Sequence, residues 1–279
     1  MKKCFYLIAA MAVMTVACKS VPEEQKVADF EAYIEQFMAE YNEKVSAIQA
    51  DSVSTDDEKR AKFEEIYEAT CDALVAECKD VIKKNPESGA AVLALKNIVG
   101  IVEPEEVEAL IAKLKGIAAE DEFVIQYKEL VAVKKATAEG KMFTDFTVVQ
   151  DENDPEGSTV KFSDFVGKGK YVLVDFWASW CGPCKRELPN IAAVYEKYKG
   201  DDFDVLSIAV WDKPEDTIKG AQEHGIVWSQ IINAQQIPTD IYGIEGIPHI
   251  MLVGPDGTIL KRDLRGEAIG EAVAEALGR

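Results

Sequence analysis

Apolar residues in the first half of the chain recur every three or four positions, which is the spacing of an amphipathic helix. The clearest stripe contains Val27, Phe30, Ile34, Phe37, Tyr41, Val45 and Ile48. Further helices are predicted from about 54 to 81, 86 to 99, 104 to 115 and 120 to 140. Because short links make neighbouring helices antiparallel, this part is expected to form a small up-and-down bundle.

Local signals mark the expected ends of these helices. Ser54 or Thr55 starts the second helix, because acidic residues fill the turn that follows. Pro86 and Pro104 stand at the expected first positions of the next two helices, where a missing N–H group costs little. Gly140 is a fitting stop for the last helix.

Two cysteines, Cys71 and Cys78, lie on the second predicted helix. Seven residues of helix rise about 10 Å, which is beyond the reach of a disulfide. Both are therefore expected to be small buried residues. The alternative is a second redox pair, which would require this segment not to be helical.

Another two cysteines, Cys181 and Cys184, follow an apolar run that predicts a strand over 171–177. Apolar residues then recur at helical spacing from Leu188 to Tyr198. Cys181 is thus expected at a helix N-terminus, where free N–H groups and the helix dipole favour its nucleophilic thiolate form. Cys184, one turn later, is placed to resolve a bond formed by Cys181.

The two intervening residues, Gly182 and Pro183, make a tight turn that keeps both sulfur atoms within bonding distance. Half of a zinc site is the alternative for such a pair, but it needs two further cysteine or histidine ligands. The histidines, His224 and His249, do not form a matching cluster in the sequence. A reactive dithiol without a metal is expected.

Residues 142–279 resemble the thioredoxin-like proteins of the TlpA/ResA type, which are membrane-tethered, extracytoplasmic thiol-disulfide oxidoreductases. The resemblance is carried by Asp145-Phe146-Thr147, Phe162-Ser163-Asp164-Phe165, Gly167-Lys168, Trp180-Cys181-Gly182-Pro183-Cys184, Tyr242-Gly243-Ile244-Glu245-Gly246-Ile247-Pro248 and Gly254-Pro255-Asp256-Gly257. Two positions depart from the family pattern. Thr144 replaces the usual proline, and His249 follows Pro248 where a hydroxyl-bearing or small residue is commoner; the second change lies beside the expected active site.

The resemblance implies a fold class for the second half of the chain. The second half is expected to be an α/β thioredoxin fold, a mixed central sheet flanked by helices, and it follows the all-α helical domain. The strands are expected near 146–150, 159–162, 171–177, 203–210, 248–253 and 258–262.

The resemblance also implies a role for each site residue. Cys181 attacks a disulfide and Cys184 breaks the resulting mixed disulfide. Asp175 resembles a buried carboxylate that manages the proton of Cys184, and burial among apolar residues should raise its pKa. Glu187, one helical turn after Cys184, matches a family glutamate with a second acid–base role. The alternative to these roles is that Asp175 is a solvated residue at the strand end and that Glu187 is only a surface charge.

Substrate contacts are expected around the dithiol. Pro248 resembles the cis-proline that faces the sulfur atoms, and it leaves the backbone of Ile247 free to pair with an extended substrate. Trp180 would shield Cys181 and offer an aromatic surface beside Gly182 and Pro183. His224 and His249 are expected to be structural or solvent-facing, and Trp177 and Trp211 are expected to pack in the core or at its rim.

The N-terminus resembles an export signal. Lys2 and Lys3 precede an apolar run over 5–16 that is too short to span a bilayer, so residues 1–17 are expected to be a signal peptide. The segment 15–18 resembles a lipobox with Cys18 as the lipidated first residue; an ordinary cleaved signal is the alternative. The domains would then be an anchored linker over 18–26, the helical domain over 27–140 and the thioredoxin-like domain over 141–279.

Composition limits the partners. The net charge of -19 argues against binding to nucleic acid or to anionic lipid surfaces. With 48% hydrophobic residues the chain can fill two cores. No glycine-rich phosphate loop is found in the sequence, and no organic cofactor is expected.

The resemblance and the N-terminal signal together imply an oxidoreductase in the cell envelope that is lipid-anchored, faces the periplasm and sits on the outer rather than the inner membrane. Its partners would be protein thiols and disulfides together with an upstream electron donor. Reduction is the expected direction, because Gly182-Pro183 and Asp175 match reducing thioredoxins. The alternatives are a disulfide oxidase or isomerase, a thiol peroxidase, and a tethered binding module with an incidental dithiol. The loop Pro-x-x-x-Thr-x-x-Cys, which peroxidases of this fold carry, is not found in the sequence.

Overall fold

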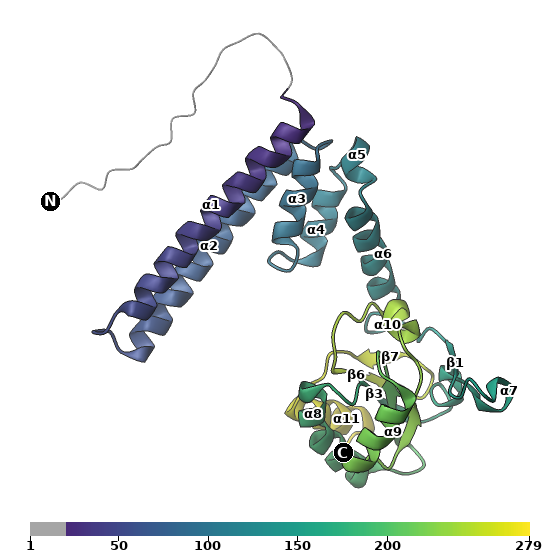
Figure 1. Cartoon of the computed structure of the whole chain (residues 1–279). Coiled ribbons are helices and arrows are strands. Elements are labelled where there is room, and N and C mark those ends of the chain that lie inside the picture. Colours follow the sequence, from purple (N-terminus) through teal and green to yellow (C-terminus); the bar gives the residue numbers. More distant parts are fainter. Residues whose placement is uncertain (1–20) are drawn as a thin grey trace. The chain divides into compact units, whose positions relative to one another are not determined.

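The computed structural model describes residues 21–279 (Figure 1). The chain divides between Ile125 and Gln126 into two compact units. The expected signal peptide over 1–17 and the lipidation site Cys18 lie outside the described residues. Within residues 21–279, no helix is both long enough and apolar enough to cross a bilayer.

The first unit is helical, as predicted. Its helices are α1 (Glu23–Ala50), α2 (Asp56–Lys84), α3 (Gly89–Ile98), α4 (Pro104–Ile111) and α5 (Gly116–Ala119), and α6 (Glu122–Ala136) begins in it and continues into the second unit. In Figure 1, α1 and α2 lie side by side as a long hairpin. Helix α3 packs against both and is apolar over most of its surface, so it forms the centre of this core.

Capping explains where these helices begin. The Thr55 hydroxyl accepts a 3.3 Å hydrogen bond from the Glu58 N–H group, and the Glu58 carboxylate accepts one of 2.8 Å from the Thr55 N–H group. Pro104 is the first residue of α4, as predicted. The predicted start at Pro86 is wrong, because Ser88 caps α3 through a 3.1 Å hydrogen bond from the Ala90 N–H group.

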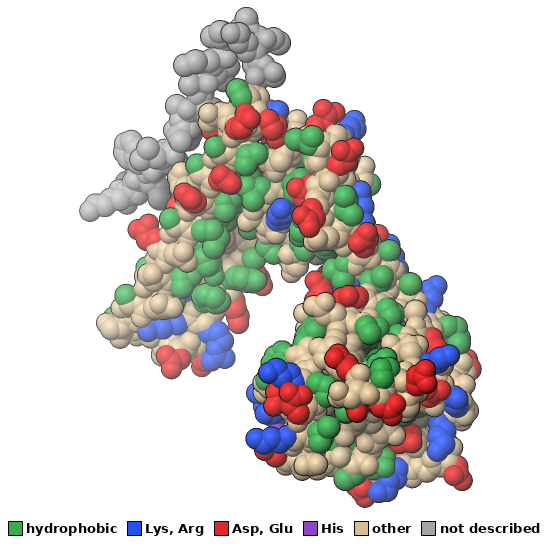
Figure 2. All heavy atoms as spheres, turned by 45° about the vertical axis from the view of Figure 1, so that its right-hand side comes forward, with side chains coloured by type: hydrophobic (Ala, Val, Ile, Leu, Met, Phe, Trp, Pro, Cys, Tyr) green, Lys and Arg blue, Asp and Glu red, His purple; other side chains and the backbone are tan. Residues whose placement is uncertain are grey.

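Hydrophobic side chains also remain at the surface of the α1–α2 hairpin. Figure 2 shows them gathered along this hairpin, and they include Tyr33, Met38, Phe63 and Tyr67. The two helices are 28 and 29 residues long, whereas α3 has 10 residues. Much of the apolar stripe of the hairpin therefore extends beyond the short helix that packs on it.

The second unit is built on a mixed central sheet, as predicted, but this sheet has five strands and includes neither of the strands predicted near 146–150 and 159–162. The sheet order is β5 (Ser229–Ile231), β4 (Phe203–Ala209), β3 (Tyr171–Trp177), β6 (His249–Val253) and β7 (Ile259–Lys261). Strand β3 is parallel to β4 and antiparallel to β6. A separate antiparallel pair joins β1 (Thr147–Val149) and β2 (Thr159–Lys161). Strand β5 was not predicted, because its three residues carry no apolar run.

Helices and turns complete this unit. They are α7 (Pro155–Ser158), the 3-10 turn η1 (Phe162–Asp164), α8 (Gly182–Tyr198), α9 (Pro214–Glu223), α10 (Ile237–Tyr242) and α11 (Glu267–Leu277). On one face of the sheet, Leu173 and Trp177 of β3 share a core with apolar residues of α8 and α11. On the other face, Val174 and Phe176 share a core with the β1–β2 segment and α10. Alternate residues of β3 thus point into different layers.

The end of α6 is tied to the rest of the second unit by polar contacts. Arg262 donates hydrogen bonds to the carbonyl oxygen (2.7 Å) and the hydroxyl group (2.8 Å) of Thr137. Lys134 forms a 2.5 Å ion pair with Glu245. The helix ends at Ala136 rather than near the predicted stop at Gly140. The domain bounds 27–140 and 141–279 stay predictions.

Candidate active site

The two cysteines that follow β3 are joined by a disulfide, Cys181–Cys184. Cys181 is the N-cap residue of α8, because the N–H group of Cys184 points at its sulfur atom at a distance of 3.1 Å. In the reduced protein, this N–H group and the helix dipole would stabilise a thiolate on Cys181. The predicted position of Cys181 at a helix N-terminus is thus the observed one.

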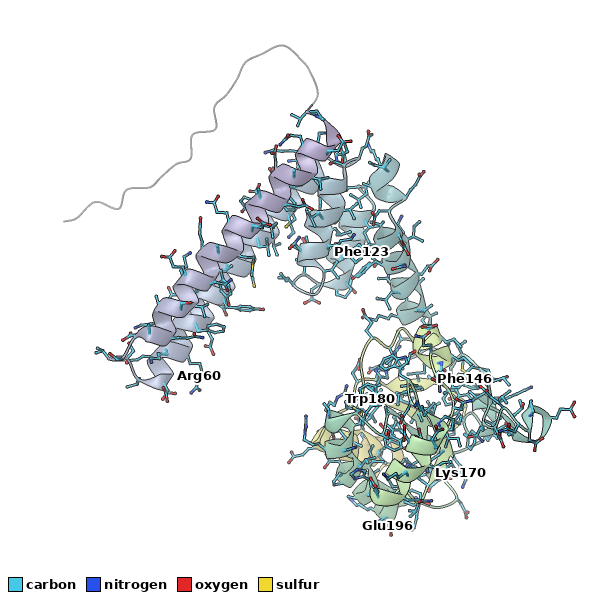
Figure 3. All side chains as sticks on the ribbon, in the orientation of Figure 1. Arg60, Phe123, Phe146, Lys170, Trp180 and Glu196 are labelled. Atoms are coloured by element: carbon cyan, nitrogen blue, oxygen red, sulfur yellow. A yellow bond between two sulfur atoms is a disulfide. The ribbon has the colours of Figure 1, made fainter. Side chains whose placement is uncertain are left out.

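The disulfide is accessible only along a narrow rim. Cys181 is 3% exposed and Cys184 is 1% exposed. Their neighbours Gly182 and Pro183 are exposed. Trp180, which is labelled in Figure 3, is 59% exposed. A reacting partner must therefore pass over this turn and the indole ring to reach the Cys181 sulfur atom.

The indole of Trp180 is held in place by a neighbouring loop. Its Nε1–H group donates a 3.0 Å hydrogen bond to the carbonyl oxygen of Trp211. The polar edge of the ring is thereby satisfied within the protein, while most of the residue stays open to solvent. Such a ring offers a rigid aromatic surface to whatever approaches Cys181.

The loop that faces the disulfide contains Ile247 and Pro248. The peptide bond between them is cis. The carbonyl oxygen of Ile247 lies 3.7 Å from the Cys181 sulfur atom. The guanidinium group of Arg265 donates hydrogen bonds to the carbonyl oxygens of Pro248 and of Leu264. Arg265 therefore holds this loop against the segment before α11, a role for which no local pattern in the sequence provides a signal.

Asp175 is buried beneath α8, on the sheet face that also carries Leu173 and Trp177. It is 1% exposed and lies opposite Ser207 of β4, whose hydroxyl group donates a 3.2 Å hydrogen bond to the carboxyl group. Ser207 in turn accepts a 2.9 Å hydrogen bond from the indole N–H group of Trp228. A solvated position for Asp175 at the strand end is thus not observed.

Burial raises the pKa of Asp175 to about 7. The hydrogen bond from Ser207 and the positive charge of Arg265 lower this pKa, and the negative charge of Glu187 raises it, but desolvation is the largest effect. A carboxyl group with such a pKa can both release and accept a proton near neutral pH.

Glu187 lies on α8 and is half-buried. Its carboxylate accepts a 3.0 Å hydrogen bond from the N–H group of Gly266 and one of 2.9 Å from the side-chain amide of Asn190. The carboxylate is therefore fixed to the segment that follows Arg265 and does not move freely at the surface.

His249 follows Pro248 but lies in the other layer. Across the β3–β6 pair it is opposite Phe176, whereas Asp175 is opposite Ile250. Its Nε2 atom lies 3.3 Å from the Arg262 guanidinium group, which can only donate, so Nε2 is assigned as an acceptor. Its Nδ1 atom then donates to Asp263 at 2.8 Å, and this hydrogen bond lowers the pKa of Asp263.

The other cysteines of the described chain belong to α2 of the first unit. Cys71 and Cys78 are free, Cys78 is fully buried and Cys71 is half-buried. Desolvation raises the pKa of Cys78 to about 12. Within residues 21–279, no cluster of three or more His, Cys, Asp or Glu residues is suited to hold a metal ion.

Two polar residues of the site were not identified from the sequence. Ser207 is a polar residue within the apolar run of β4. This break in the pattern was the available signal, and the structure explains it, because Ser207 pairs with Asp175 on the neighbouring strand. Arg265 carries no comparable local signal, because it acts on a loop residue 17 positions earlier in the chain.

Comparison with known proteins places these residues in context. Residues 140–262, which include Cys181, Cys184 and Pro248, match the AhpC/TSA family. The chain is 27% identical over 135 residues to the thiol-disulfide oxidoreductase ResA of Bacillus subtilis (strain 168), covering 48% of this chain and 72% of that protein. For ResA of Geobacillus thermodenitrificans (strain NG80-2), the identity is 29% over 135 residues, which cover 48% of this chain and 74% of that protein. The chain is also similar to the crystal structure of the thioredoxin domain of a thiol-disulfide oxidoreductase from Bacteroides vulgatus. The identity is 33%, the match covers 50% of this chain and 96% of that one, and the TM-score is 0.43.

Proposed function

The chain is a thioredoxin-like thiol-disulfide oxidoreductase of the ResA type, and on this basis we propose that it reduces disulfides of other proteins through Cys181 and Cys184. The observation that carries the proposal is the position of Cys181, which caps α8 and lies beside the loop containing Pro248. The direction rests on the Gly182-Pro183 turn and on the buried Asp175 below it.

The reaction begins with the reduced dithiol. The Cys181 thiolate attacks one sulfur atom of a substrate disulfide, forms a mixed disulfide and releases the first substrate thiolate. Cys184 then loses its proton and attacks the Cys181 sulfur atom, which releases the second substrate thiolate. Two electrons pass to the substrate, and the enzyme is left with the Cys181–Cys184 disulfide. A dithiol donor must reduce this disulfide before the next turnover.

Asp175 is proposed as the group that takes the proton of Cys184. Its pKa of about 7 lets it act as a base toward a thiol and return the proton when the disulfide is reduced again. Glu187 is proposed to act by position and charge: it fixes the segment next to Arg265, and its negative charge raises the pKa of Asp175.

Substrate is proposed to bind across the rim of the disulfide. Trp180, Gly182 and Pro183 are exposed there, and the backbone of Ile247 next to Pro248 would pair with an extended segment of the substrate. The protein would work in the cell envelope, facing the periplasm from an outer-membrane lipid anchor on Cys18. Mass spectrometry of Cys18 and membrane fractionation of a Cys18→Ser variant would test the anchor.

The central experiment traps the mixed disulfide. Cys184→Ser protein, expressed in its native host, should accumulate disulfide-linked partners that reducing gels release. Cys181→Ser protein should trap none, because the attacking sulfur atom is missing. Equal trapping by both variants would contradict the assignment of Cys181 as the nucleophile.

The reduction potential decides the direction. The oxidised fraction of the peptide carrying Cys181 and Cys184 would be measured by mass spectrometry after equilibration of the purified protein in redox buffers. A potential close to that of thioredoxin, about -270 mV, supports a reductase. A value close to that of a strongly oxidising periplasmic enzyme, about -120 mV, would assign disulfide formation instead.

A further inference from the structure

A groove of about 850 Å³ lies beside the active-site disulfide. Trp180, the residue before Cys181, forms part of its lining, and Trp211 lies next to it. The rest of the lining comes from the segment after β1, the first turns of α9 and the segment after β5. A groove of this size can hold several side chains of a polypeptide. Trp180 lines the groove and also forms part of the exposed rim around the disulfide. The groove is therefore continuous with the surface over which substrates must approach.

The groove is held to the active site by buried polar contacts. The carboxylate of Asp212 accepts a 2.6 Å hydrogen bond from the N–H group of Ser179 and one of 3.1 Å from the hydroxyl group of Thr217. Ser179 lies two residues before Cys181, and Thr217 lies on α9. These contacts tie the α9 wall of the groove to the residues just before the disulfide.

The groove is strongly acidic. Asp151 and Glu152 enter it from the segment after β1, and Glu215 and Asp216 enter it from the first turn of α9. All four are exposed, and none forms an ion pair with a lysine or arginine in the described part of the chain. The groove is lined entirely by described residues, and among them Lys213 is the one lysine or arginine.

Helix chemistry alone does not account for this charge. Acidic residues in a first helical turn stabilise a helix through its dipole, which explains Glu215 and Asp216. Asp151 and Glu152 lie about 60 residues earlier in the chain, outside any helix, and still face the same groove. Two separate segments thus bring unpaired negative charge next to two indole rings.

We propose that this groove binds a positively charged segment of the protein substrate, so that lysine or arginine residues near the disulfide select which disulfides reach Cys181. The ammonium or guanidinium group would face the carboxylates, and its aliphatic stem or planar head would lie on the exposed ring of Trp180. This inference rests on the proposed function, because it names the class of disulfide that the same site reduces.

The test uses three synthetic peptides that carry the same intramolecular disulfide, flanked by lysine, glutamine or glutamate residues. The reduced full chain is freed of reductant and mixed with each peptide, and the second-order rate constant is followed by thiol trapping. The readout is the ratio of the rate constants for the lysine and glutamate peptides. We expect a ratio of at least about 10 at about 0.05 M KCl, falling toward 1 at about 0.5 M KCl.

Charge reversal locates the effect. The double variant Glu215→Lys, Asp216→Lys should lower the ratio at least about tenfold. The matched control is Glu271→Lys, Glu275→Lys, which makes the same change of net charge at two exposed positions of α11 and should keep the ratio within about twofold. Circular dichroism and thermal melting establish that each variant is folded. If the α9 variant does not fold, Asp151→Asn with Glu152→Gln tests the other wall, and an unchanged ratio there overturns the proposal.

The remaining outcomes separate the two proposals. If all three peptides are reduced at equal rates, the groove does not select by charge and this inference is wrong, while the proposed reductase function stands. If the ratio falls equally in the α9 variant and in the α11 control, net charge acts from a distance and the groove is not the binding site. If none of the peptides is reduced, the proposed function fails and the inference fails with it.

Discussion

The hydroxyl group of Ser207 donates a hydrogen bond to the carboxyl group of Asp175 across the β3–β4 pair. Both side chains are fully buried, and the indole of Trp228 completes the chain of hydrogen bonds. This contact favours the charged form of Asp175 and therefore opposes the effect of burial on its pKa. The pKa of Asp175 on β3 is thus set by two opposing effects: burial raises it, and the hydrogen bond from Ser207 on β4 lowers it.

Replacing Ser207 with alanine should shift this balance. The variant Ser207→Ala loses the donor to Asp175, so the pKa of Asp175 should rise further above its ordinary value. It also leaves the Trp228 N–H group without its acceptor, which should cost about 1–3 kcal/mol of stability. Carbon-13 NMR titration of the Asp175 carboxyl group measures the first effect. Ser229→Ala, an exposed serine on β5, is the control, and an unchanged titration in Ser207→Ala would contradict the assigned role.

The buried carboxyl group should make folding stability depend on pH. Because the pKa of Asp175 is about 7 in the folded protein and near 4 when unfolded, the folded state binds the proton more tightly. Asp175 therefore lowers stability progressively as pH rises from about 4 to about 7. The variant Asp175→Asn does not titrate, so relative to wild type it should gain up to about 4 kcal/mol between pH 4 and pH 8. Urea unfolding at both pH values measures this gain, and an equal difference at both would rule out a raised pKa.

Arg265 should act on the reaction as a positioning residue. The variant Arg265→Gln weakens the contact with the Pro248 carbonyl oxygen and removes a positive charge that lowers the pKa of Asp175. We expect the rate constant for reduction of a peptide disulfide to fall by about tenfold, since hydrogen bonds from charged groups contribute about 1.5–3 kcal/mol. The pH profile of the reaction should also shift upward, which a purely structural effect would not produce.

Arg279→Gln is the matched control for this variant. Arg279 pairs with Asp202, which precedes β4 and therefore lies at the opposite end of the sheet from Cys181. Its loss should leave both the rate constant and the pH profile within about twofold of wild type, as expected for an exposed ion pair. A similar loss of rate in both arginine variants would mean that net charge, not the contact with Pro248, is responsible.

The two cysteines of α2 should differ in reactivity. Cys78 is fully buried and burial raises the pKa of its thiol to about 12, so it should resist alkylation in the native protein. Cys71 is half-buried and should react first. Mass spectrometry after timed exposure to iodoacetamide measures both rates, with denatured protein as the control in which the rates converge. Fast labelling of Cys78 in the native state would show that α2 opens.

Several features of this protein follow from local sequence. The apolar run over 171–177 and the helical spacing after Cys184 place the dithiol at a strand-to-helix junction, because both patterns act within a few residues. The start of α2 at Thr55 and the start of α4 at Pro104 are equally local, since a cap is formed by residues within one turn. Where two local signals compete, as at Pro86 and Ser88, the capping hydroxyl determines the start.

Only the tertiary structure decided the surroundings of the dithiol. Ser207 meets Asp175 from 32 residues away, and Gly266 meets Glu187 from 79 residues away. Strand β5, too short to carry a pattern, forms only because β4 offers it an edge. These contacts depend on strand register and on the paths of loops, and neither can be read from a short stretch of sequence. Helices and their caps, in contrast, are determined by interactions within one turn.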